Sequence, residues 1–507
     1  MNDHSRTLDG DSAAERPRAV VDLVLTVLAH PELRRVGEQA VLEQDAPEPS
    51  IHRKFPLFSR AGEQPRPLES RHVSRQPVLV LRDGARVTLR AGGERPLVVD
   101  GRPAGEHALD AARLHGGVVI ELSRRVVVLL RAGEACAAPD GLGLVGVSPG
   151  LQAVREAIGR VGPSEHPVLL RGETGVGKER VAAALHQVSR RARGPFVAVN
   201  CAAIPATTAP SQLFGHARGA FTGSVGAHAG YFGEAEGGTL FLDEIGEMPV
   251  EVQSMLLRAL ETGEAQPVGG TVRKLDLRVL SATDAPLERL ASEGQFRSAL
   301  MHRLGALRVD IPPLRARRED VPLQLLHFLR DELGPAAALL DAGDDERDPW
   351  LGADVILACV RHAWPGNTRE LRAVARWIAL HGADLPRAGV PPVLDTASAT
   401  AGADTRAPPE PAADEAPRTG VSDAAQFRSA LEAADHRVEV AARALGLSRN
   451  TLRARMREHG IRRAADIEAA ELDEARAYAG DNVAAMAAHL GVGEHALRIR
   501  IGQIERG

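Results

Sequence analysis

The hydrophobic and polar positions follow three different patterns along the chain. Between residues 19 and 133, short apolar runs such as Val118 to Leu122 are separated by Gly, Asp and Arg turns, which predicts an all-β sandwich of about 110 residues. From residue 145 to about 388, apolar strands alternate with helical periodicity, which predicts an α/β domain with a parallel sheet. From residue 423 onward the periodicity is helical. The sequence therefore predicts a multidomain protein with an all-α C-terminal region.

Three polar segments lie outside these patterns. Residues 1–18 are polar, and we expect them to be disordered. Residues 134–144 form a short predicted linker. Residues 389–422 consist largely of Ala, Pro, Thr, Asp and Glu without apolar periodicity, which is typical of a flexible linker.

A glycine-rich turn follows the apolar strand Val168 to Leu170 and leads into a helical pattern. Such a turn lets backbone N–H groups face a phosphate, and the lysine that follows it reaches the β- and γ-phosphates. Glu179 stands after the lysine, where a Ser or Thr is usual. The sequence therefore predicts a P-loop that binds ATP through Gly172, Glu173, Thr174, Gly175, Val176, Gly177, Lys178 and Glu179.

A second apolar strand, which begins after Gly238, ends in two carboxylates, Asp243 and Glu244. A carboxylate in this context suits a Mg²⁺ ion, and the next one suits the polarisation of a water molecule. We therefore expect Asp243 to hold Mg²⁺ and Glu244 to take part in ATP hydrolysis.

Composition and charge restrict the function further. The net charge is −5, so any DNA-binding surface must be local. The three cysteines, Cys136, Cys201 and Cys359, are too far apart for a disulfide framework or a zinc motif. The chain has no apolar run long enough for a membrane span and no signal-peptide pattern, which predicts a cytoplasmic protein without a membrane partner.

The central region resembles the AAA+ domain of sigma-54 activators of the NtrC type, the bacterial enhancer-binding proteins. The signature loop follows Leu213-Phe-Gly-His216. Its apolar tip is a plausible contact for a partner, and the resemblance implies that it contacts sigma-54. The loop departs from the family pattern at Ala217 and Ser224. The residues of the signature loop are Gly219, Ala220, Phe221, Thr222 and Gly223.

The same resemblance assigns roles to further residues. Asn200 would restrain the catalytic glutamate, and Thr283 and Asp284 would occupy the first sensor position, where relatives usually have asparagine. Arg297 and Arg303 match the paired arginines that reach a neighbouring subunit, with Ala299 in place of the usual aspartate. A helical lid at about residues 313–388 would carry Arg369 as the second sensor. The resemblance also implies a ring of subunits, expected to be a hexamer.

The N-terminal sandwich resembles a forkhead-associated (FHA) domain, in which an arginine and a later Ser-Arg pair hold phosphothreonine. The matching residues are Arg60, Ser74 and Arg75. Ser59, Pro77 and Asp100 depart from the FHA pattern. The residue types suit a phosphate. Phosphopeptide binding and a purely structural sandwich both stay open; the first would make a phosphothreonine protein or a Ser/Thr kinase a partner.

Residues 423–462 contain a helix, a turn at Gly446 and a second helix, for which Ser448 is a good N-cap. Seven arginines and one acidic residue lie between residues 441 and 463, which is a local electrostatic footprint for DNA. The segment resembles a Fis-type helix-turn-helix and implies binding to an upstream DNA element. The expected contacts are Ser448, Arg449, Asn450, Thr451, Arg453 and Arg455.

Residues 463–507 repeat this helix-turn-helix pattern, with Gly491 in the place of Gly446 and Leu497 in the place of Leu452. The motif therefore looks duplicated. The second copy has fewer arginines, and both DNA binding and simple packing stay open for it.

Together the resemblances imply a sigma-54-dependent transcriptional activator. Its ATPase ring would remodel the sigma-54 RNA polymerase holoenzyme to open promoters, and its sandwich would regulate this activity. Two alternatives stay open. The first is a DNA-binding repressor or scaffold whose ATPase no longer activates sigma-54, which Ala217, Ser224, Asp284 and Ala299 favour. The second is a phosphoprotein adaptor that works through residues 19–133.

Overall fold

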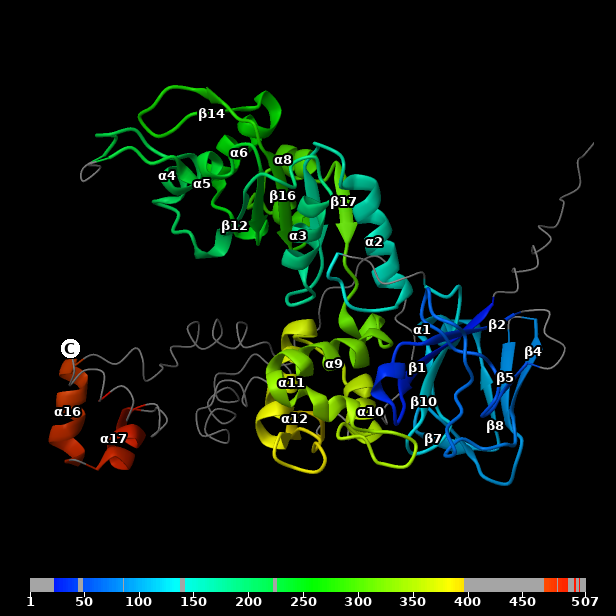
Figure 1. Cartoon of the computed structure of the whole chain (residues 1–507). Coiled ribbons are helices and arrows are strands. Elements are labelled where there is room, and N and C mark those ends of the chain that lie inside the picture. The colour runs from blue at the N-terminus through cyan, green and yellow to red at the C-terminus, as the bar shows by residue number, and fades with distance from the viewer. Residues whose placement is uncertain are drawn as a thin grey trace, which may run out of the picture. The chain divides into compact units, whose positions relative to one another are not determined.

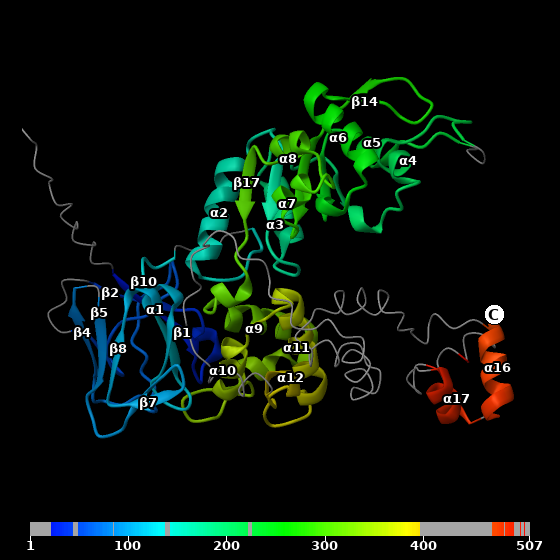
Figure 2. The same cartoon turned by 180° about the vertical axis from the view of Figure 1, so that it is seen from behind.

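The structure is a computed structural model. It describes residues 22–43, 49–84, 86–136, 142–221, 226–395, 469–480, 482–490, 497 and 501. These residues belong to two compact units, residues 1–403 and residues 404–507. Figure 1 and Figure 2 show the elements from opposite sides.

The N-terminal region consists of two antiparallel sheets that enclose one core, which confirms the prediction of a sheet-rich region. The first sheet has the order β2-β1-β10-β9-β6-β7, and the second has the order β3-β4-β5-β8. Apolar residues of both sheets meet in one cluster, for example Leu25 and Val128 of the first and Val80 and Leu89 of the second. The elements are β1 (Leu23–Ala29), η1 (Leu33–Arg35), β2 (Gln39–Leu42), β3 (Ser50–Ile51), β4 (Val78–Asp83), β5 (Arg86–Ala91), β6 (Leu97–Val99), β7 (Arg102–Ala104), β8 (Glu106–Leu109), α1 (Ala111–Gly116), β9 (Val118–Glu121) and β10 (Val127–Ala132).

The central region contains the predicted parallel sheet, in the order β12-β13-β16-β11-β17. Successive strand residues point to opposite faces, as a strand requires. Val168 and Leu170 therefore pack in the core under α2 and α3, while Leu169 packs in the core under α4 to α8. The strands are β11 (Val168–Arg171), β12 (Phe196–Asn200), β13 (Thr239–Asp243), β16 (Arg278–Thr283) and β17 (Leu307–Asp310). The helices are α2 (Pro149–Val161), α3 (Lys178–Gln187), α4 (Ala209–Phe214), α5 (Gly230–Glu234), α6 (Val250–Thr262), α7 (Leu287–Ser292) and α8 (Ser298–Leu304), with the short η2 (Cys201–Ala203) and η3 (Ile245–Glu247).

A two-stranded hairpin, β14 (Glu264–Ala265) and β15 (Arg273–Lys274), extends from the end of α6. The lid then follows the sheet, as predicted. It comprises η4 (Leu314–Ala316), α9 (Asp320–Leu333), η5 (Gly334–Asp341), α10 (Ala353–Arg361), α11 (Asn367–Gly382) and α12 (Pro392–Asp395). All three tryptophans of the chain, at positions 350, 364 and 377, lie in this lid.

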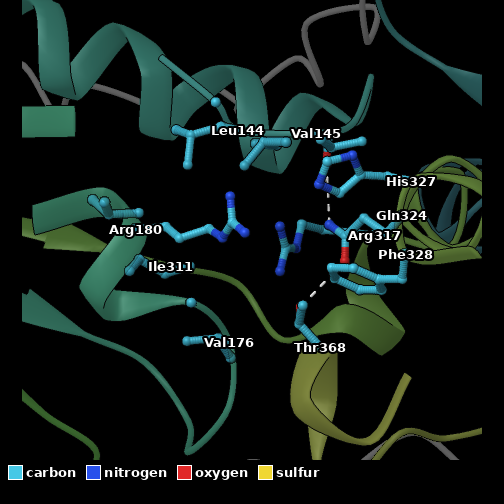
Figure 3. Close-up of a pocket in the computed structure, with 14 residues that line it drawn as sticks. Leu144, Val145, Val176, Arg180, Ile311, Arg317, Gln324, His327, Phe328 and Thr368 are labelled. Atoms are coloured by element: carbon cyan, nitrogen blue, oxygen red, sulfur yellow. Dashed lines mark hydrogen bonds between the residues drawn. The ribbon is translucent and has the colours of Figure 1, made fainter. Parts of the chain in front are cut away.

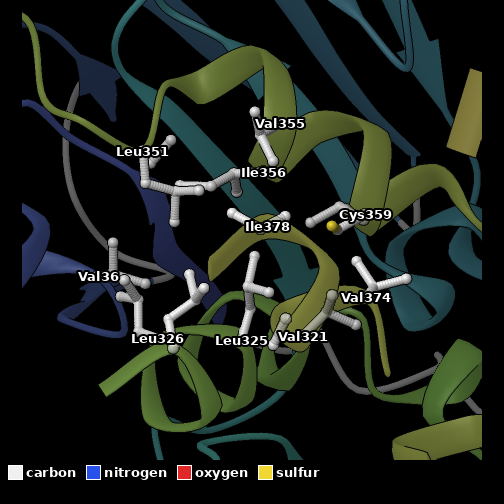
Figure 4. Packing of buried hydrophobic residues seen from close by; sticks show 14 of the residues in the cluster. Val36, Val321, Leu325, Leu326, Leu351, Val355, Ile356, Cys359, Val374 and Ile378 are labelled. Carbon is white, nitrogen blue, oxygen red and sulfur yellow. The ribbon is translucent and has the colours of Figure 1, made fainter. Parts of the chain in front are cut away.

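The sandwich and the lid share a hydrophobic core. Leu28 of β1, Val36 and Leu129 of β10 belong to the same buried cluster as lid residues such as Leu326 and Ile356. Figure 4 shows Val36 beside Leu326 in this cluster. This packing explains why every residue of β1 is buried, since one face of the strand lies in the sandwich core and the other lies on the lid.

Polar contacts surround this shared core. Asp345 of the lid accepts hydrogen bonds from Ser70 Oγ at 2.6 Å and from the Arg71 N–H at 2.8 Å. Further ion pairs join Glu121 to Arg361 at 2.6 Å and Arg125 to Asp348 at 2.7 Å. The sandwich is therefore docked on the lid through both apolar and charged groups.

In the second unit, α16 (Ala469–Ala479) and α17 (Val483–Leu490) pack through Leu472, Ala475, Met486 and Ala487, with Leu497 in the same cluster. The predicted helix-turn-helix at 423–462, with all six predicted DNA-binding residues, lies outside the described residues. The duplication of that motif stays a prediction. No described helix is both long and apolar enough to cross a membrane.

Candidate nucleotide-binding and hydrolysis site

The turn between β11 and α3 forms the predicted phosphate cradle. Gly175 and Gly177 have φ angles of 79° and 102°, in the left-handed region that favours glycine. A Cβ on Gly175 would also clash with the carbonyl oxygen of Gly366 in the lid. Lys178 is buried at the end of the turn, with its Nζ 3.1 Å from the carbonyl oxygen of Gly172. A cation and the N-terminus of a helix thus converge, as a phosphate site requires.

The two carboxylates lie at the end of β13, beside this cradle. Asp243 Oδ1 accepts a hydrogen bond from the Glu244 N–H at 3.0 Å. Glu244 has a φ of 51°, a left-handed conformation that is uncommon outside glycine and recurs at functional sites. Its Oε1 lies 3.6 Å from Lys178 Nζ. The predicted catalytic residues Lys178 and Glu244 are therefore in direct contact.

Asp284 places a further carboxylate beside Glu244. It accepts a short hydrogen bond from Thr174 Oγ1 of the cradle and also bonds to Glu244. Burial, together with the nearby carboxylates of Asp284 and Asp243, raises the pKa of Glu244 above its usual range, although Lys178 opposes the shift. Burial also acts to raise the pKa of Asp284, but the bond from Thr174 and the charge of Lys178 hold it below its usual value. Of the two carboxyl groups, Glu244 therefore has the higher pKa.

This arrangement predicts a pH effect of the Asp284→Asn substitution. Removing the Asp284 carboxylate should lower the pKa of Glu244, because one of the negative charges that disfavour its ionised form is gone. Glu244 must be ionised to orient water, so the acid limb of the pH profile of kcat should move to lower pH. Steady-state ATPase assays between pH 5 and pH 9 would measure this shift of the acid limb. An unchanged acid limb would contradict the assignment of Glu244 as the group that titrates.

Two other predicted residues make contacts that the sequence did not suggest. Asn200 Oδ1 accepts the Ala202 N–H at 2.9 Å, and no hydrogen bond joins the side chains of Asn200 and Glu244, both of which the structure describes. Thr283 is buried, and its Oγ1 accepts the Ala285 N–H at 3.0 Å. Thr283 thus orders the turn that presents Asp284. The restraining role of Asn200 stays a prediction.

The lid contributes Asn367, to which sequence analysis gave no role. Its side chain is fully buried, donates to Glu173 Oε2 and to the Thr174 carbonyl oxygen, both at 3.1 Å, and accepts the Leu314 N–H at 2.8 Å. The signal available in the sequence was an asparagine after a Pro-Gly turn, because asparagine tolerates a left-handed conformation such as the φ of 51° found here. Asn367 therefore ties the start of α11 to the phosphate cradle.

Arg315 and Arg369 flank the same junction. Arg315 forms a two-pronged ion pair with Glu173, with distances of 2.5 and 2.7 Å, and this pairing lowers the pKa of Glu173 to about 2. Arg369 lies in the first turn of α11, with its Cβ against Gly175, and is exposed. The predicted second sensor is thus close to the cradle. Glu179 is also exposed, in the first turn of α3.

An apolar pocket adjoins the cradle. Leu144, Val176, Ile311 and Phe328 line it, and Figure 3 shows Arg180 and Arg317 directed toward its middle from opposite sides. The Arg317 side chain is buried, and its Nε and Nη2 atoms have no hydrogen-bond partner among the described residues. Buried polar atoms of this kind usually have a partner. The pocket therefore suits a ligand with an apolar ring and hydrogen-bond acceptors, such as the base of a nucleotide.

One wall of this pocket comes from the segment that follows the predicted linker. The Val145 carbonyl oxygen accepts a hydrogen bond from Gln324 of α9 at 3.1 Å, and Asp320 accepts bonds from the N–H groups of Val147 and Ser148 at 2.6 and 2.8 Å. Gly143 and Leu144, at the end of the linker predicted at 134–144, also line the pocket.

The two predicted inter-subunit arginines differ in their contacts. Arg303 donates from Nε and Nη2 to the Leu260 carbonyl oxygen, at 3.2 and 2.8 Å. Arg297 is exposed, and its guanidinium has no hydrogen bond or ion pair within the described residues. Of the two, Arg297 is therefore the one whose side chain is available to a second subunit.

The predicted sigma-54 loop is described up to Phe221; Thr222 and Gly223 lie outside the described residues. Backbone hydrogen bonds between His216 and His228 close the base of the loop, at 3.0 and 2.9 Å. The Phe221 ring lies 4.9 Å from the His216 ring and is 49% exposed. An exposed aromatic ring at this place is consistent with a protein contact.

The three predicted phosphopeptide residues have different surroundings, and a common phosphate site stays a prediction. Arg60 donates to the carbonyl oxygens of Arg34 and Val36, at 2.6 and 2.7 Å, which explains its place in the sandwich without a ligand. Ser74 lines a groove of about 870 Å³ that Arg71, Arg95 and Arg124 also line. Arg75 is exposed, and the lining of the groove includes neither Arg60 nor Arg75.

Comparison with known proteins shows the family to which this chain belongs. Residues 144–310 match the Sigma-54 interaction domain, and residues 427–459 match the family described as Bacterial regulatory protein, Fis family. The chain is 41% identical to the DNA-binding transcriptional regulator NtrC of Salmonella typhimurium over 341 residues, which cover 63% of this chain and 70% of that protein. The chain belongs to the NtrC family of sigma-54-dependent transcriptional regulators.

Other NtrC-family members match over different lengths. The C4-dicarboxylate transport transcriptional regulatory protein DctD of Rhizobium meliloti is 39% identical, with 69% of this chain and 72% of that protein covered. The NtrC of Escherichia coli K12 is 47% identical, but the match covers only about half of each chain (47% and 50%). A crystal structure of NtrX from Brucella abortus in complex with ATP aligns with a TM-score of 0.45 at 31% identity, and covers 62% of this chain and 69% of that one.

The family assignment and the site agree. This NtrC-family regulator is an AAA+ P-loop ATPase, and the cradle, the two carboxylates and the apolar pocket lie together as the candidate nucleotide site. Sequence analysis found the cradle and the carboxylates. It gave no role to Asn367 in spite of the Pro-Gly turn before it, and it missed Arg180, Arg317 and Gln324, because these three residues carry no signal within their own segment of the chain.

Proposed function

We propose that this protein opens sigma-54-dependent promoters by ATP hydrolysis in a ring of subunits, a hexamer by family resemblance. The observation that carries the proposal is the convergence of Lys178, Glu244 and the lid residue Asn367 on one phosphate cradle. The C-terminal region would hold the protein at an upstream DNA element through the Fis-type motif.

ATP is the proposed substrate, with its base in the pocket between Leu144 and Arg317 and its phosphates on the cradle. Lys178 would leave Glu244 to contact the phosphates, because the negative charge of the phosphates attracts it more strongly than one carboxylate does. The Asp243 carboxylate fits a Mg²⁺ ion, which when bound would neutralise charge on the phosphates. The residues present thus fit both the nucleotide and the ion.

Hydrolysis requires Glu244 in its ionised form. Its carboxylate would orient a water molecule whose oxygen attacks the γ-phosphorus, while the bond to the β-phosphate oxygen breaks and ADP leaves. Asp284 would have to give up its bond to Glu244 for this step. An arginine from the neighbouring subunit, Arg297 or Arg303, would stabilise the charge that develops.

Uncoupling of the loop from the ATPase tests the promoter-opening proposal. Phe221→Ala should leave ATP turnover within about twofold of the parent and abolish open-complex formation on a sigma-54 promoter, since the exposed ring touches His216 and no nucleotide-site residue. Permanganate footprinting and phosphate release on one preparation measure both activities. Promoter opening by the Phe221→Ala variant at parental rates would contradict the assigned contact.

A second candidate function is favoured by one observation. Asp284 accepts a hydrogen bond from Thr174 and also bonds to Glu244, and these bonds hold its carboxylate against the cradle. The negative charge of this carboxylate repels a γ-phosphate. A repressor or scaffold whose ATPase no longer activates sigma-54 would fit this feature. The footprinting experiment separates the two functions, because a repressor binds DNA without opening the promoter.

The sandwich would regulate the ATPase through the lid. The support is the shared core around Val36 and Leu326 and the contacts of Asp345 with the segment Ser70–Arg71, which continues into the groove. A phosphothreonine peptide, from a partner or a Ser/Thr kinase, is the proposed ligand of this groove. A purely structural sandwich stays the alternative.

The groove carries a testable prediction about that ligand. Arg95 and Arg124 are exposed and have no hydrogen bond or ion pair with any described residue, so they are available to a phosphate. The Arg95→Ala/Arg124→Ala variant should lose at least about tenfold in affinity for phosphothreonine peptides, measured by fluorescence anisotropy. Arg86→Ala, an exposed arginine that does not line the groove, is the matched control. A library without any phosphopeptide binder would leave the structural alternative.

A further inference from the structure

A single buried glutamine connects the segment after the catalytic carboxylate to the exposed Arg297. Gln253 lies in the first turn of α6 and is completely buried. Its Nε2 donates to the carbonyl oxygens of Met248, at 2.9 Å, and of Gln295, at 3.0 Å. Its Oε1 accepts the backbone N–H of Arg297 at 2.8 Å. The side-chain amide therefore binds three backbone groups and joins the segment at Met248 to the segment Gln295–Arg297.

These bonds hold the backbone of Arg297 while its side chain stays exposed. Phe296 and Leu300, on either side of Arg297, are buried in the core of the α6–α8 face. Arg297 is the N-cap of α8, and its N–H has Gln253 as its partner. Loss of Gln253 would leave that N–H and two carbonyl oxygens without their partner, which is costly in a buried place. The adjustment with the smallest free-energy cost is a shift of the turn that contains Arg297.

We infer that Gln253 is a positioning residue for Arg297, and that it fixes the arginine which one subunit presents to the nucleotide of the next. This inference rests on the proposed sharing of the site between subunits. The other end of the amide holds Met248, which follows η3 directly after Glu244. A structural role limited to the subunit's own site is therefore the competing explanation, and the two predict opposite results in mixed rings.

The first measurement is the kinetic behaviour of the Gln253→Met variant. Methionine has nearly the volume of glutamine and removes all three hydrogen bonds. We expect kcat for ATP hydrolysis to fall about 10²-fold, the usual scale for a catalytic group displaced by about 1 Å, with ATP affinity within about twofold of the parent. Gln253→Glu keeps an oxygen for the Arg297 N–H and should lose less activity. Gln295→Met is the matched control, because only the backbone carbonyl of Gln295 takes part and its side chain is exposed.

Mixed rings decide between the two explanations. Glu244→Gln subunits lack the carboxylate but present an intact arginine, and Arg297→Ala subunits have an intact site but present no arginine. If Gln253 positions Arg297, a Gln253→Met subunit should recover activity with Glu244→Gln partners and gain none with Arg297→Ala partners. The opposite pattern, recovery with both partners, or recovery with neither would overturn the inference.

The baseline mixture separates this inference from the proposed function. Glu244→Gln and Arg297→Ala subunits together should regain activity if the site is shared. Failure of that mixture would count against the shared site itself, whereas its success with the wrong pattern for Gln253→Met would count against Gln253 alone. Tryptophan fluorescence of the lid shows whether Gln253→Met folds. If it does not, Gln253→Glu replaces it in the same mixtures. We expect the same pattern of recovery and a smaller loss of ATPase activity.

Discussion

Replacing Glu244 with Gln is expected to stop ATP turnover while ATP binding survives. The amide keeps the shape of the side chain and removes the charge that orients water, so turnover should fall by about 10³-fold or more. Lys178→Ala should instead weaken ATP binding, because it removes a cation from the cradle. Arg297→Ala should spare binding by the isolated subunit and cut turnover by about 10³-fold, the scale of an arginine supplied in trans.

Fluorescent-nucleotide binding and phosphate release measure these two properties separately. Glu247→Gln provides the matched control, since Glu247 is an exposed acid three residues beyond Glu244 and should change neither property by more than about twofold. Turnover by Glu244→Gln at a tenth of the parental rate would show that another group orients the water. Arg303→Ala, tested in parallel, would reveal whether the bond from Arg303 to Leu260 can open when subunits assemble.

Replacing Arg131 with Met should destabilise the contact between sandwich and lid, and more at pH 8 than at pH 6. Arg131 of β10 and Glu319 of the lid are both buried, with 3.3 Å between Arg131 Nε and Glu319 Oε1. Burial raises the pKa of Glu319 to about 7 even with the arginine present. Removing one partner of a buried ion pair leaves an uncompensated charge and costs about 3–5 kcal/mol.

The pH dependence follows from the direction of this shift. A carboxyl group whose pKa is raised on folding is more stable in the folded state when protonated, so its destabilising effect is small below its usual pKa and grows as the pH rises through about 7. Without Arg131 the pKa of Glu319 should rise further, because the arginine lowers it. The cost of Arg131→Met should therefore be largest at pH 8, where Glu319 would otherwise be ionised.

Urea denaturation followed by tryptophan fluorescence measures this prediction in the lid itself, where all three tryptophans lie. Arg131→Met/Glu319→Gln should recover most of the loss, since neither member of the pair is then left charged without its partner. The control is Arg124→Met, an exposed arginine in the turn before β10 without an ion pair to any described residue, which should change stability by less than about 0.5 kcal/mol. Equal losses at pH 6 and pH 8 would contradict the role of Glu319.

Several features of the protein were determined by local sequence alone. The glycines before Lys178 dictate a turn with positive φ, and the apolar run before Asp243 dictates a buried strand that ends in carboxylates. Both patterns depend on residues within about ten positions of each other. The parallel sheet and the sheet-rich N-terminal region followed in the same way from the periodicity of apolar residues.

Only the tertiary structure decided which distant groups meet. Nothing in the segment around Arg131 indicates that Glu319 is its partner, and the uniform burial of β1 has its cause in lid helices about 300 residues away. Arg60 has the residue type of a phosphate ligand, yet its Nη2 donates to the carbonyl oxygens of Arg34 and Val36. The chemistry of a side chain limits which groups it can bind, whereas long-range packing determines which of those groups it contacts in the folded protein.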